Sequence, residues 1–277
     1  MQMKLVVFPF ALVALLLSQA LAESTDCKYP SLIVADGRIN QSRFAAGTAS
    51  SPTFYWFALL AQTGHSYSVE FVSPTDNYTN SNSPPVWFGW FTVYGPNDTL
   101  SSSCVGTSTL VYKDTYQYSP VLQVNGAGDG QRRSFLAPSA GNPYLIRIAN
   151  MGGAGNYSFR VVDTTLFNPR WSTWSGYDTQ WGFLNLSDMP IDCTFTVYDS
   201  GNNQLAARQF TLAPGGQPGS QVMHISSPAD LNLPRNASGY AVLAHTGPPT
   251  AILPDAYMLN GSATVVIVSK FETRGNQ

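Results

Sequence analysis

Apolar and polar residues alternate along short segments of this chain, which is the pattern of β-strands with one buried face. In residues 66–72 (SYSVEFV), Tyr67, Val69 and Phe71 share one face, while Ser68 and Glu70 share the other. Further strand-like segments, rich in β-branched and aromatic residues, recur at intervals of roughly ten residues. They are 31–40, 53–60, 86–94, 144–149, 157–162, 182–185, 193–198, 204–212, 220–225, 239–245, 256–259 and 263–268. Because no helical pattern separates these segments, we predict an all-β fold of antiparallel sheets.

The composition agrees with this fold and narrows the classes of function. Charged residues make up 11% of the chain, against about 25% in an average soluble domain. With 14 basic and 16 acidic residues, the chain lacks the basic surplus of nucleic-acid-binding proteins. Hydrophobic residues make up 44%, which excludes a disordered chain. The scarcity of charged helix formers argues against a helical bundle.

Residues 1–22 have the three parts of a secretory signal peptide. Lys4 gives a basic start, residues 5–17 form an apolar run, and Ala20 and Ala22 supply the small residues before a cleavage point. A membrane anchor is the alternative, but the run is shorter than the roughly 20 residues that a spanning helix needs. We therefore expect the mature chain to be secreted, or held at the cell surface, without a membrane span.

The rest of the chain has the length of two β-sandwiches in tandem, of the jelly-roll or immunoglobulin-like type. We place the first sandwich at residues 23–163 and the second at residues 164–277. Residues 91–100 (FTVYGPNDTL) are similar to residues 195–205 (FTVYDSGNNQL), and each segment suggests a strand, a polar turn and the next strand. The similarity between these two short segments supports two domains of the same kind.

Three cysteines, Cys27, Cys104 and Cys193, leave at least one without a partner in the same chain. An exported protein can form disulfides. We expect Cys27 to pair with Cys104, because both lie in the first half of the mature chain. Cys193 is then expected to be a small buried residue of a strand. No Cys/His cluster has the spacing of a structural zinc site.

Four segments of the first half follow the strand rhythm of a known family. They are residues 57–71 (FALLAQTGHSYSVEF), 91–95 (FTVYG), 144–148 (YLIRI) and 155–161 (GNYSFRV). Their order resembles bacterial pre-peptidase C-terminal domains, which are secreted β-sandwich modules attached to proteases and other exported enzymes. The resemblance implies an accessory or binding role and brings no catalytic residues to this sequence. The second half, including residues 167–171 (FNPRW) and 175–182 (SGYDTQWG), is similar to a secreted bacterial module of unknown activity.

Two residues of the second half raise a catalytic alternative. His245 ends an expected strand and Asp178 lies in the same half, so that together with a serine they could form a hydrolytic triad. However, the chain has no Gly-x-Ser-x-Gly elbow. A buried hydrogen-bonded cluster of His245, Asp178 and Tyr177 is the other interpretation. We expect no enzyme, and we keep a secreted hydrolase around His245 and Asp178 as the alternative.

The leading functional candidate is a group of aromatic residues in a stretch rich in Ser, Thr and Gly. Trp171, Trp174, Tyr177 and Trp181 are close in sequence, and Asp178 lies among them. Flat aromatic faces can cover the C–H faces of sugar rings, while carboxylate and amide groups bind the hydroxyls. We expect these five residues to bind a saccharide. The alternative is that the tryptophans fill the ends of the sandwich or the seam between the domains.

Four polar loops have residues that could bind calcium, whose ligands are carboxylate and amide oxygens. These residues are Asp76–Asn77, Asn97–Asp98, Asn125 with Asp129, and Asp199 with Asn202–Asn203. Asp and Asn are also ordinary turn formers, and no EF-hand spacing occurs. We favour the turn interpretation and expect no cofactor, with calcium as the alternative.

The sequence thus predicts a secreted, non-catalytic protein that binds or builds structure outside the cell. The expected roles are adhesion, matrix association or attachment to a polysaccharide. The expected partners are an extracellular polysaccharide or another surface protein, and not nucleic acid. The low charge suits neutral polymers or packing between copies of the chain. Exposed strand edges would allow such copies to associate by strand addition.

Overall fold

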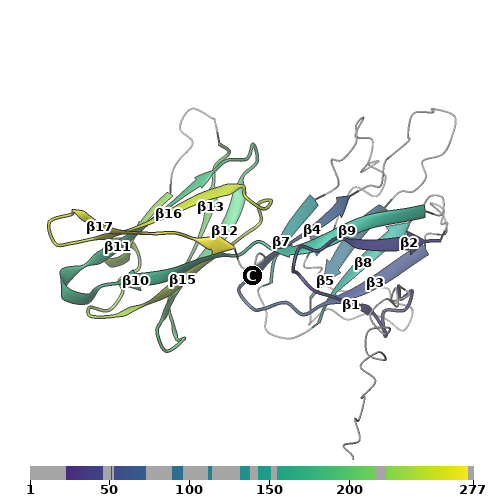
Figure 1. The fold of residues 1–277 in the computed structure, drawn as a ribbon, viewed down its shortest axis with the longest axis horizontal. Coiled ribbons are helices and arrows are strands. Elements are labelled where there is room, and N and C mark those ends of the chain that lie inside the picture. Colours follow the sequence, from purple (N-terminus) through teal and green to yellow (C-terminus); the bar gives the residue numbers. More distant parts are fainter. Residues whose placement is uncertain are drawn as a thin grey trace, which may run out of the picture.

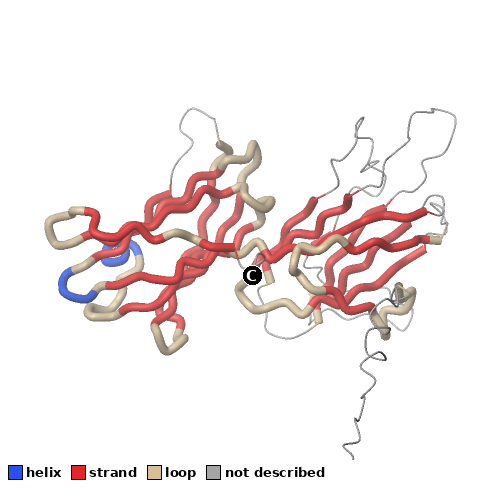
Figure 2. The backbone as a smooth tube through the Cα atoms, in the orientation of Figure 1, coloured by secondary structure: helices blue, strands red, loops and turns tan. Residues whose placement is uncertain are grey.

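The computed structural model describes residues 23–45, 51, 53–72, 89–95, 112–113, 132–137, 143–150, 155–215 and 223–273. In this part of the chain the regular structure is almost entirely β-strand, arranged as two β-sandwiches one after the other (Figures 1 and 2). Helix among the described residues is limited to the single turn α1 (Ser227–Asp230) and the 3₁₀ turn Trp174–Gly176. The predicted all-β fold is confirmed.

The first sandwich consists of two sheets with the core between them (Figure 1). One sheet has the strand order β1-β3-β8-β5-β6, and the other has the order β2-β9-β4-β7. Neighbouring strands are antiparallel, except for β1 and β3, which are parallel. The strands are β1 (Ser31–Ile33), β2 (Asn40–Phe44), β3 (Thr53–Leu59), β4 (Ser66–Val72), β5 (Gly89–Tyr94), β6 (Tyr112–Lys113), β7 (Arg132–Leu136), β8 (Tyr144–Asn150) and β9 (Gly155–Asp163).

Strand β4 is buried on both faces, although its alternation predicts one polar face. Tyr67 and Val69 lie in the core as expected. Glu70 on the other face is also buried, because Arg160 lies opposite it on β9 and its Nε donates a hydrogen bond to Oε2 of Glu70 at 2.6 Å. Since β4 is an inner strand between β9 and β7, side chains of two neighbouring strands flank its polar face.

The second sandwich also has two sheets, and all of its strand pairs are antiparallel. One sheet has the order β13-β12-β15-β10-β18, and the other has the order β14-β11-β16-β17. The strands are β10 (Leu166–Ser172), β11 (Asp178–Asn185), β12 (Ile191–Asp199), β13 (Gln204–Leu212), β14 (Met223–Ser226), β15 (Ser238–His245), β16 (Ile252–Leu259), β17 (Val265–Ser269) and β18 (Glu272–Thr273).

Aromatic rings form the centre of the second core. Trp181 and Phe183 of β11 face Phe195 of β12, with ring centroids 5.0 and 5.3 Å apart. All three side chains are fully buried. They connect the two sheets, because β11 and β12 belong to different sheets. Burial of such large side chains supplies a major part of the hydrophobic stabilisation.

A β-bulge in β10 changes the direction in which its side chains point. Asn168 pairs with Ala241 and Trp171 pairs with Gly239, so that three steps along β10 match two steps along β15. Without the extra residue, strict alternation from Asn168 would turn Trp171 toward solvent. Because of the bulge, Trp171 is fully buried, and residues 169–170 are exposed next to each other.

Gly239 lies where β15 passes close to β12, and the contact requires a glycine. A Cβ atom at this position would overlap the carbonyl oxygen of Tyr198 and would lie 2.8 Å from the Cα of Asp199. Gly239→Ala is expected to lower the free energy of unfolding by about 1–3 kcal/mol, because these backbone atoms cannot rotate away. Urea denaturation measures the change. Gly261→Ala is the matched control, because a Cβ there meets no atom within 4 Å. Equal stability losses in the two variants would contradict the expectation.

The passage from the first sandwich to the second is short and buried. Strand β9 ends at Asp163 and β10 begins at Leu166, next to the predicted boundary between residues 163 and 164. Thr164 and Thr165 between them are 2% and 1% exposed. The amide of Thr164 donates to the carbonyl of Ser66 at 2.9 Å, and the amide of Ser66 donates to Oγ1 of Thr165 at 2.9 Å. Both linker residues are therefore held by the start of β4.

Two side-chain contacts strengthen this junction. The Nδ1 of His65 lies 2.9 Å from Oδ2 of Asp163, and both side chains are nearly buried. The hydroxyl of Ser134 in β7 donates a 2.8 Å hydrogen bond to the carbonyl of Gly247, in the loop after β15. The second contact joins the two sandwiches directly, at a point far from the linker in sequence.

Cys193 is a buried strand residue with a free thiol, as the sequence predicts. Burial, assisted by the neighbouring charge of Asp192, raises the pKa of this thiol to about 12. Cys104 lies outside the described residues, so the pairing of Cys27 with Cys104 stays a prediction, and so does the signal peptide at residues 1–22. Within the described ranges, no helix has the length and apolar character needed to cross a membrane.

Candidate functional site

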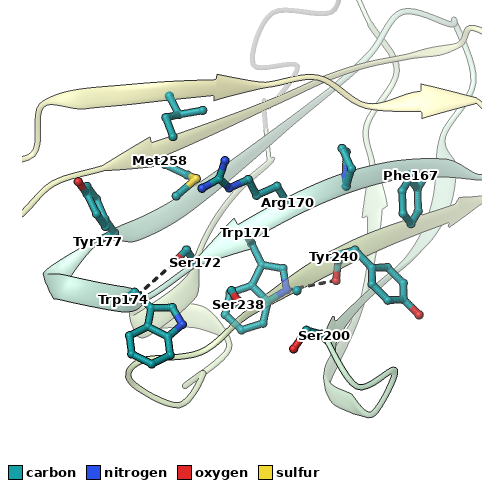
Figure 3. Close-up of a pocket in the computed structure, with 13 residues that line it drawn as sticks. Phe167, Arg170, Trp171, Ser172, Trp174, Tyr177, Ser200, Ser238, Tyr240 and Met258 are labelled. Atoms are coloured by element: carbon teal, nitrogen blue, oxygen red, sulfur yellow. Dashed lines mark hydrogen bonds between the residues drawn. The ribbon is translucent and has the colours of Figure 1, made fainter.

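An open pocket of about 600 Å³ lies in the second sandwich, beside the C-terminal half of β10 (Figure 3). Strand β10 and the turn after it form one wall, with Ser172, Trp174 and Tyr177. The start of β15 and the turn after β12 form another, and Met258 of β16 and Ile267 of β17 close the far side. The pocket thus gathers residues from both sheets of this sandwich.

The pocket is open because β10 has only one neighbour along this half. Strand β18 pairs with Leu166 and Phe167 and extends no further along β10. Pro169 follows, and a proline has no amide hydrogen with which to continue a strand pairing. Among the described strands, the segment from Pro169 to Ser172 therefore pairs with β15 alone. The open edge lies at the bulge, where bulges commonly change the direction of side chains.

Only part of the predicted aromatic group lies in the pocket with its side chain accessible. Trp174 is 53% exposed, and Tyr177 is partly exposed. Both line the pocket. Trp171 also borders it, but its side chain is fully buried, and its indole N–H donates to the carbonyl of Tyr198 at 2.9 Å and to that of Tyr240 at 3.2 Å. Trp171 therefore supports the pocket from below.

Two of the five predicted ligand-binding residues do not line this pocket. Trp181 is a core residue, and its indole N–H donates to Oδ1 of Asn168 at 3.3 Å. Asp178 accepts hydrogen bonds from the hydroxyls of Ser226 and Ser227, which tie the start of β11 to the turn α1. The burial of Trp181 and Trp171 favours the alternative interpretation, in which the tryptophans fill the sandwich.

The turn that carries Trp174 has an unusual backbone. Ser175 and Gly176 have positive φ angles of 53° and 77°. A non-glycine residue such as Ser175 adopts this conformation uncommonly. The amide of Trp174 donates to Oγ of Ser172 at 3.2 Å, and the amide of Tyr177 donates to the carbonyl of Trp174 at 2.9 Å. These bonds fix the turn so that the Trp174 ring projects outward (Figure 3).

A row of three aromatic rings next to the pocket was missed by the sequence reasoning. Tyr198 and Tyr240 stack with centroids 4.9 Å apart and planes 12° apart, and Phe167 lies 5.3 Å from Tyr240. Burial, with a smaller contribution from Tyr240, raises the pKa of Tyr198, so its hydroxyl stays protonated at neutral pH. The three rings come from β12, β15 and β10. Only the strand register brings them together, and single-strand patterns carry no signal for it.

Arg170 is the charged side chain among the described residues that line this pocket. It is exposed on the bulge next to Pro169. No carboxylate lies among the lining residues. The other polar side chains of the pocket are the hydroxyls of Ser172, Ser200, Ser238 and the two tyrosines. The pocket therefore combines apolar rings and hydroxyls with one positive charge.

The predicted His245 and Asp178 pair does not form one site. His245 ends β15 on the side of the domain junction, where Asp163 contributes to its electrostatic environment. Asp178 begins β11 at the opposite end, where β15 starts. The length of β15 separates the two ends by about 23 Å, at about 3.3 Å per residue. The predicted cluster of His245, Asp178 and Tyr177 is wrong for the same reason.

Two of the three histidines lie at the domain junction near Asp163, and the third lies apart from them. His65 contacts Asp163 at the junction, His245 is buried nearby at the end of β15, and His224 is exposed on β14. Within the described residues, no group of His, Cys, Asp and Glu has the arrangement of a metal site. The His65 and Asp163 pair at the junction lies next to Ser66, whose hydroxyl accepts a hydrogen bond from that of Thr164, and this group does not include Asp178.

One of the four predicted calcium loops lies within the described residues. In this loop the carboxylate of Asp199 accepts hydrogen bonds from the turn that it belongs to. Oδ1 of Asp199 accepts hydrogen bonds from the amides of Gly201 and Asn203, each at 2.8 Å. A hydrogen bond from the side chain of Asn203, assisted by these two backbone bonds, lowers the pKa of Asp199. The loops at Asp76–Asn77, Asn97–Asp98 and Asn125 with Asp129 lie outside the described residues.

The predicted self-association concerns strand edges, and β17 is one of them. It is the outermost strand of its sheet. Its residues Val265 and Val268 are exposed, and none of its side chains is charged. An edge of this kind keeps unpaired backbone groups that another strand can bind. Association of copies stays a prediction.

Comparisons with known proteins leave the family open. No protein-family model matches the chain, and no curated protein matches it. Among solved structures, the full extracellular region of zebrafish Gpr126/Adgrg6 aligns with 88% of this chain at 8% sequence identity and a TM-score of 0.24. The chain covers 37% of that structure's length. The resemblance to pre-peptidase C-terminal domains therefore stays an expectation.

Proposed function

We propose that this protein is a non-catalytic binding protein of the cell exterior that holds a saccharide in the pocket beside β10. The observation that carries the proposal is Trp174, whose ring is 53% exposed at the wall of the pocket. A tryptophan in this position presents a flat apolar face to the C–H groups of a sugar ring. Covering that face removes apolar surface from water and so contributes affinity.

The polar groups of the pocket suit the hydroxyls of a sugar. Ser200 and Ser238 each carry an accessible hydroxyl that can donate and accept hydrogen bonds, whereas the buried hydroxyl of Ser172 accepts a hydrogen bond from the amide of Trp174. The volume of about 600 Å³ lies within the range of small-ligand sites. Because the pocket lies along an open strand edge, we expect it to accept a unit within a chain as well as a free sugar. Attachment to an extracellular polysaccharide follows from such a site.

The hydrolase alternative has less support. Its two named residues, His245 and Asp178, lie at opposite ends of the second sandwich, about 23 Å apart by strand length. General acid–base chemistry needs the two groups within hydrogen-bond reach of one substrate, directly or through a water. The arrangement of the pocket favours binding.

The test replaces Trp174 with alanine. We expect Trp174→Ala to weaken binding at least about tenfold, which corresponds to about 1.4 kcal/mol, because the variant loses the stacking face. A glycan array of neutral and acidic saccharides identifies the ligand for the wild-type protein, and isothermal titration calorimetry then measures both Kd values. Trp174→Phe is expected to retain part of the affinity.

Leu186→Ala provides the matched control. Leu186 is a large exposed apolar residue of the same sandwich, beside the end of β11 that is remote from the pocket. Its removal is expected to leave the Kd unchanged. An array without any saccharide signal, or equal losses in Trp174→Ala and Leu186→Ala, would refute the proposal.

A further inference from the structure

Resting on the proposed function, we infer that the saccharide is acidic, and that Arg170 binds a carboxylate of a uronate unit. The pocket contains a positive charge and no negative one among its described lining residues. A neutral polymer can accept hydrogen bonds from the arginine but leaves its charge uncompensated, whereas a uronate neutralises that charge. The expected ligand is therefore an acidic polymer, in place of the neutral polymer that the low overall charge suggests.

The first support is the position of Arg170 on the bulge. The extra residue in β10 leaves Pro169 and Arg170 exposed in succession, so the arginine side chain emerges at the open edge of the strand. Figure 3 shows its side chain extending from β10 toward Met258, while the Trp174 ring projects from the turn after β10, and both residues line the pocket. A saccharide that spans the pocket from Trp174 would therefore also reach the guanidinium group.

The second support is that the guanidinium is available. The arginines Arg38, Arg160 and Arg208 each have a carboxylate partner, at 3.2, 2.6 and 2.8 Å. Arg170 has no hydrogen bond or ion pair within the described part of the chain. An arginine keeps its charge at all physiological pH values and presents several N–H donors in a planar fork. That fork can hold both oxygens of one carboxylate, which a lysine cannot do.

The third support is the apolar setting. Pro169, Met258 and Ile267 line the pocket together with Arg170, and none of them carries a charge. A carboxylate that enters displaces water from the guanidinium, and apolar walls strengthen the attraction between the two charges. The same walls provide no competing partner for Arg170. The recognised group is therefore a carboxylate of the same saccharide chain that stacks on Trp174.

The experiment compares pairs of ligands that differ only in charge. Oligomers of galacturonate, glucuronate and mannuronate are titrated against the full-length secreted protein, each together with its methyl ester. We expect at least one acid form to bind the wild-type protein about tenfold or more tightly than its ester, and we expect this preference to fall as salt is raised. Sulfated dextran is the third arm, and stronger binding of it than of every uronate would overturn the assignment of a carboxylate.

The variant Arg170→Gln separates this inference from the proposed function. We expect Arg170→Gln to lose the preference for the acid form while keeping the affinity for the ester, and Arg170→Lys to keep part of the preference. Lys28→Gln, which removes the same charge from an exposed site on the first sandwich, is expected to change neither Kd. If esters and acids bind equally in the wild-type protein and binding still depends on Trp174, the inference fails and the proposed function stands. If no saccharide of either kind binds, both fail.

Discussion

Replacing Trp171 with alanine is expected to lower the free energy of unfolding of the second sandwich by about 3–5 kcal/mol. The side chain is fully buried, and its indole N–H donates to two backbone carbonyls, those of Tyr198 and Tyr240. The substitution leaves a cavity between the sheets and removes a hydrogen-bond donor from both carbonyls. Urea denaturation followed by circular dichroism measures the loss.

Trp174→Ala is the matched control for this measurement, because it removes the same side chain three residues further along. Trp174 is half exposed and lies outside the core. The expected change in the free energy of unfolding is within about 0.5 kcal/mol, as for most surface substitutions. The pair thus separates support of the fold from contact with a ligand. A stable Trp171→Ala variant would show that the indole is dispensable to the core and would contradict the described packing.

The second large effect is a loss of stability in acid that depends on His245. Burial lowers the pKa of this histidine from 6.5 to about 4, against smaller opposing effects of the Thr164 and Gly247 backbone and of Asp163. The folded protein therefore keeps the ring neutral, whereas the unfolded chain takes up a proton below pH 6.5. The contribution of the neutral His245 ring to the free energy of unfolding is fully present above pH 6.5, and it is lost progressively as the pH falls from 6.5 to 4. At about 1.4 kcal/mol for each pH unit, the total loss is about 3 kcal/mol.

The measurement compares the wild-type protein with His245→Gln at a series of pH values between 7.5 and 4. Titration of other groups affects both proteins equally, so the difference between the two free energies of unfolding isolates His245. The wild-type protein is expected to lose about 3 kcal/mol more than the variant over this range. Two parallel curves would show that the histidine has no depressed pKa.

The fold class was predictable because strand signals are local. Alternation in β4 and the aliphatic and aromatic segments around β12 and β15 place the strands close to their observed positions. The linker also lies where the sequence divides the two sandwiches. Each of these inferences needs only a short window of sequence, together with the usual size of a sandwich.

The site was only partly predictable, because it depends on register. Closeness in sequence grouped Trp171 and Trp181 with Trp174, but the bulge at residues 169–170 turns Trp171 inward, and Trp181 lies on the core face of β11. Proximity in sequence suggested that Asp178 joins the aromatic group, whereas its hydrogen bonds connect it to Ser226 and Ser227. Pro169 was the available clue, since a proline inside a strand signals an edge or a bulge.

The aromatic row of Phe167, Tyr240 and Tyr198 could not be foreseen at all. These residues lie on three strands that are neighbours only through the order β12-β15-β10. Tyr198 pairs directly with Tyr240, while Phe167 pairs with Val242, two positions further along β15. A cross-strand pair of this kind is fixed by the packing of the whole sheet. The order of the strands in the sheet, which the composition does not indicate, places these three rings side by side.

The tight passage between the sandwiches has a mechanical consequence for the proposed attachment to a polymer. Thr164 and Thr165 leave no slack between β9 and β10, and both are hydrogen-bonded to Ser66. A force applied to the second sandwich is thus transmitted through these hydrogen bonds to β4, which is an inner strand of a sheet in the first sandwich. Tension would have to break these bonds and the Ser134 to Gly247 bond together, instead of straightening a loose tether.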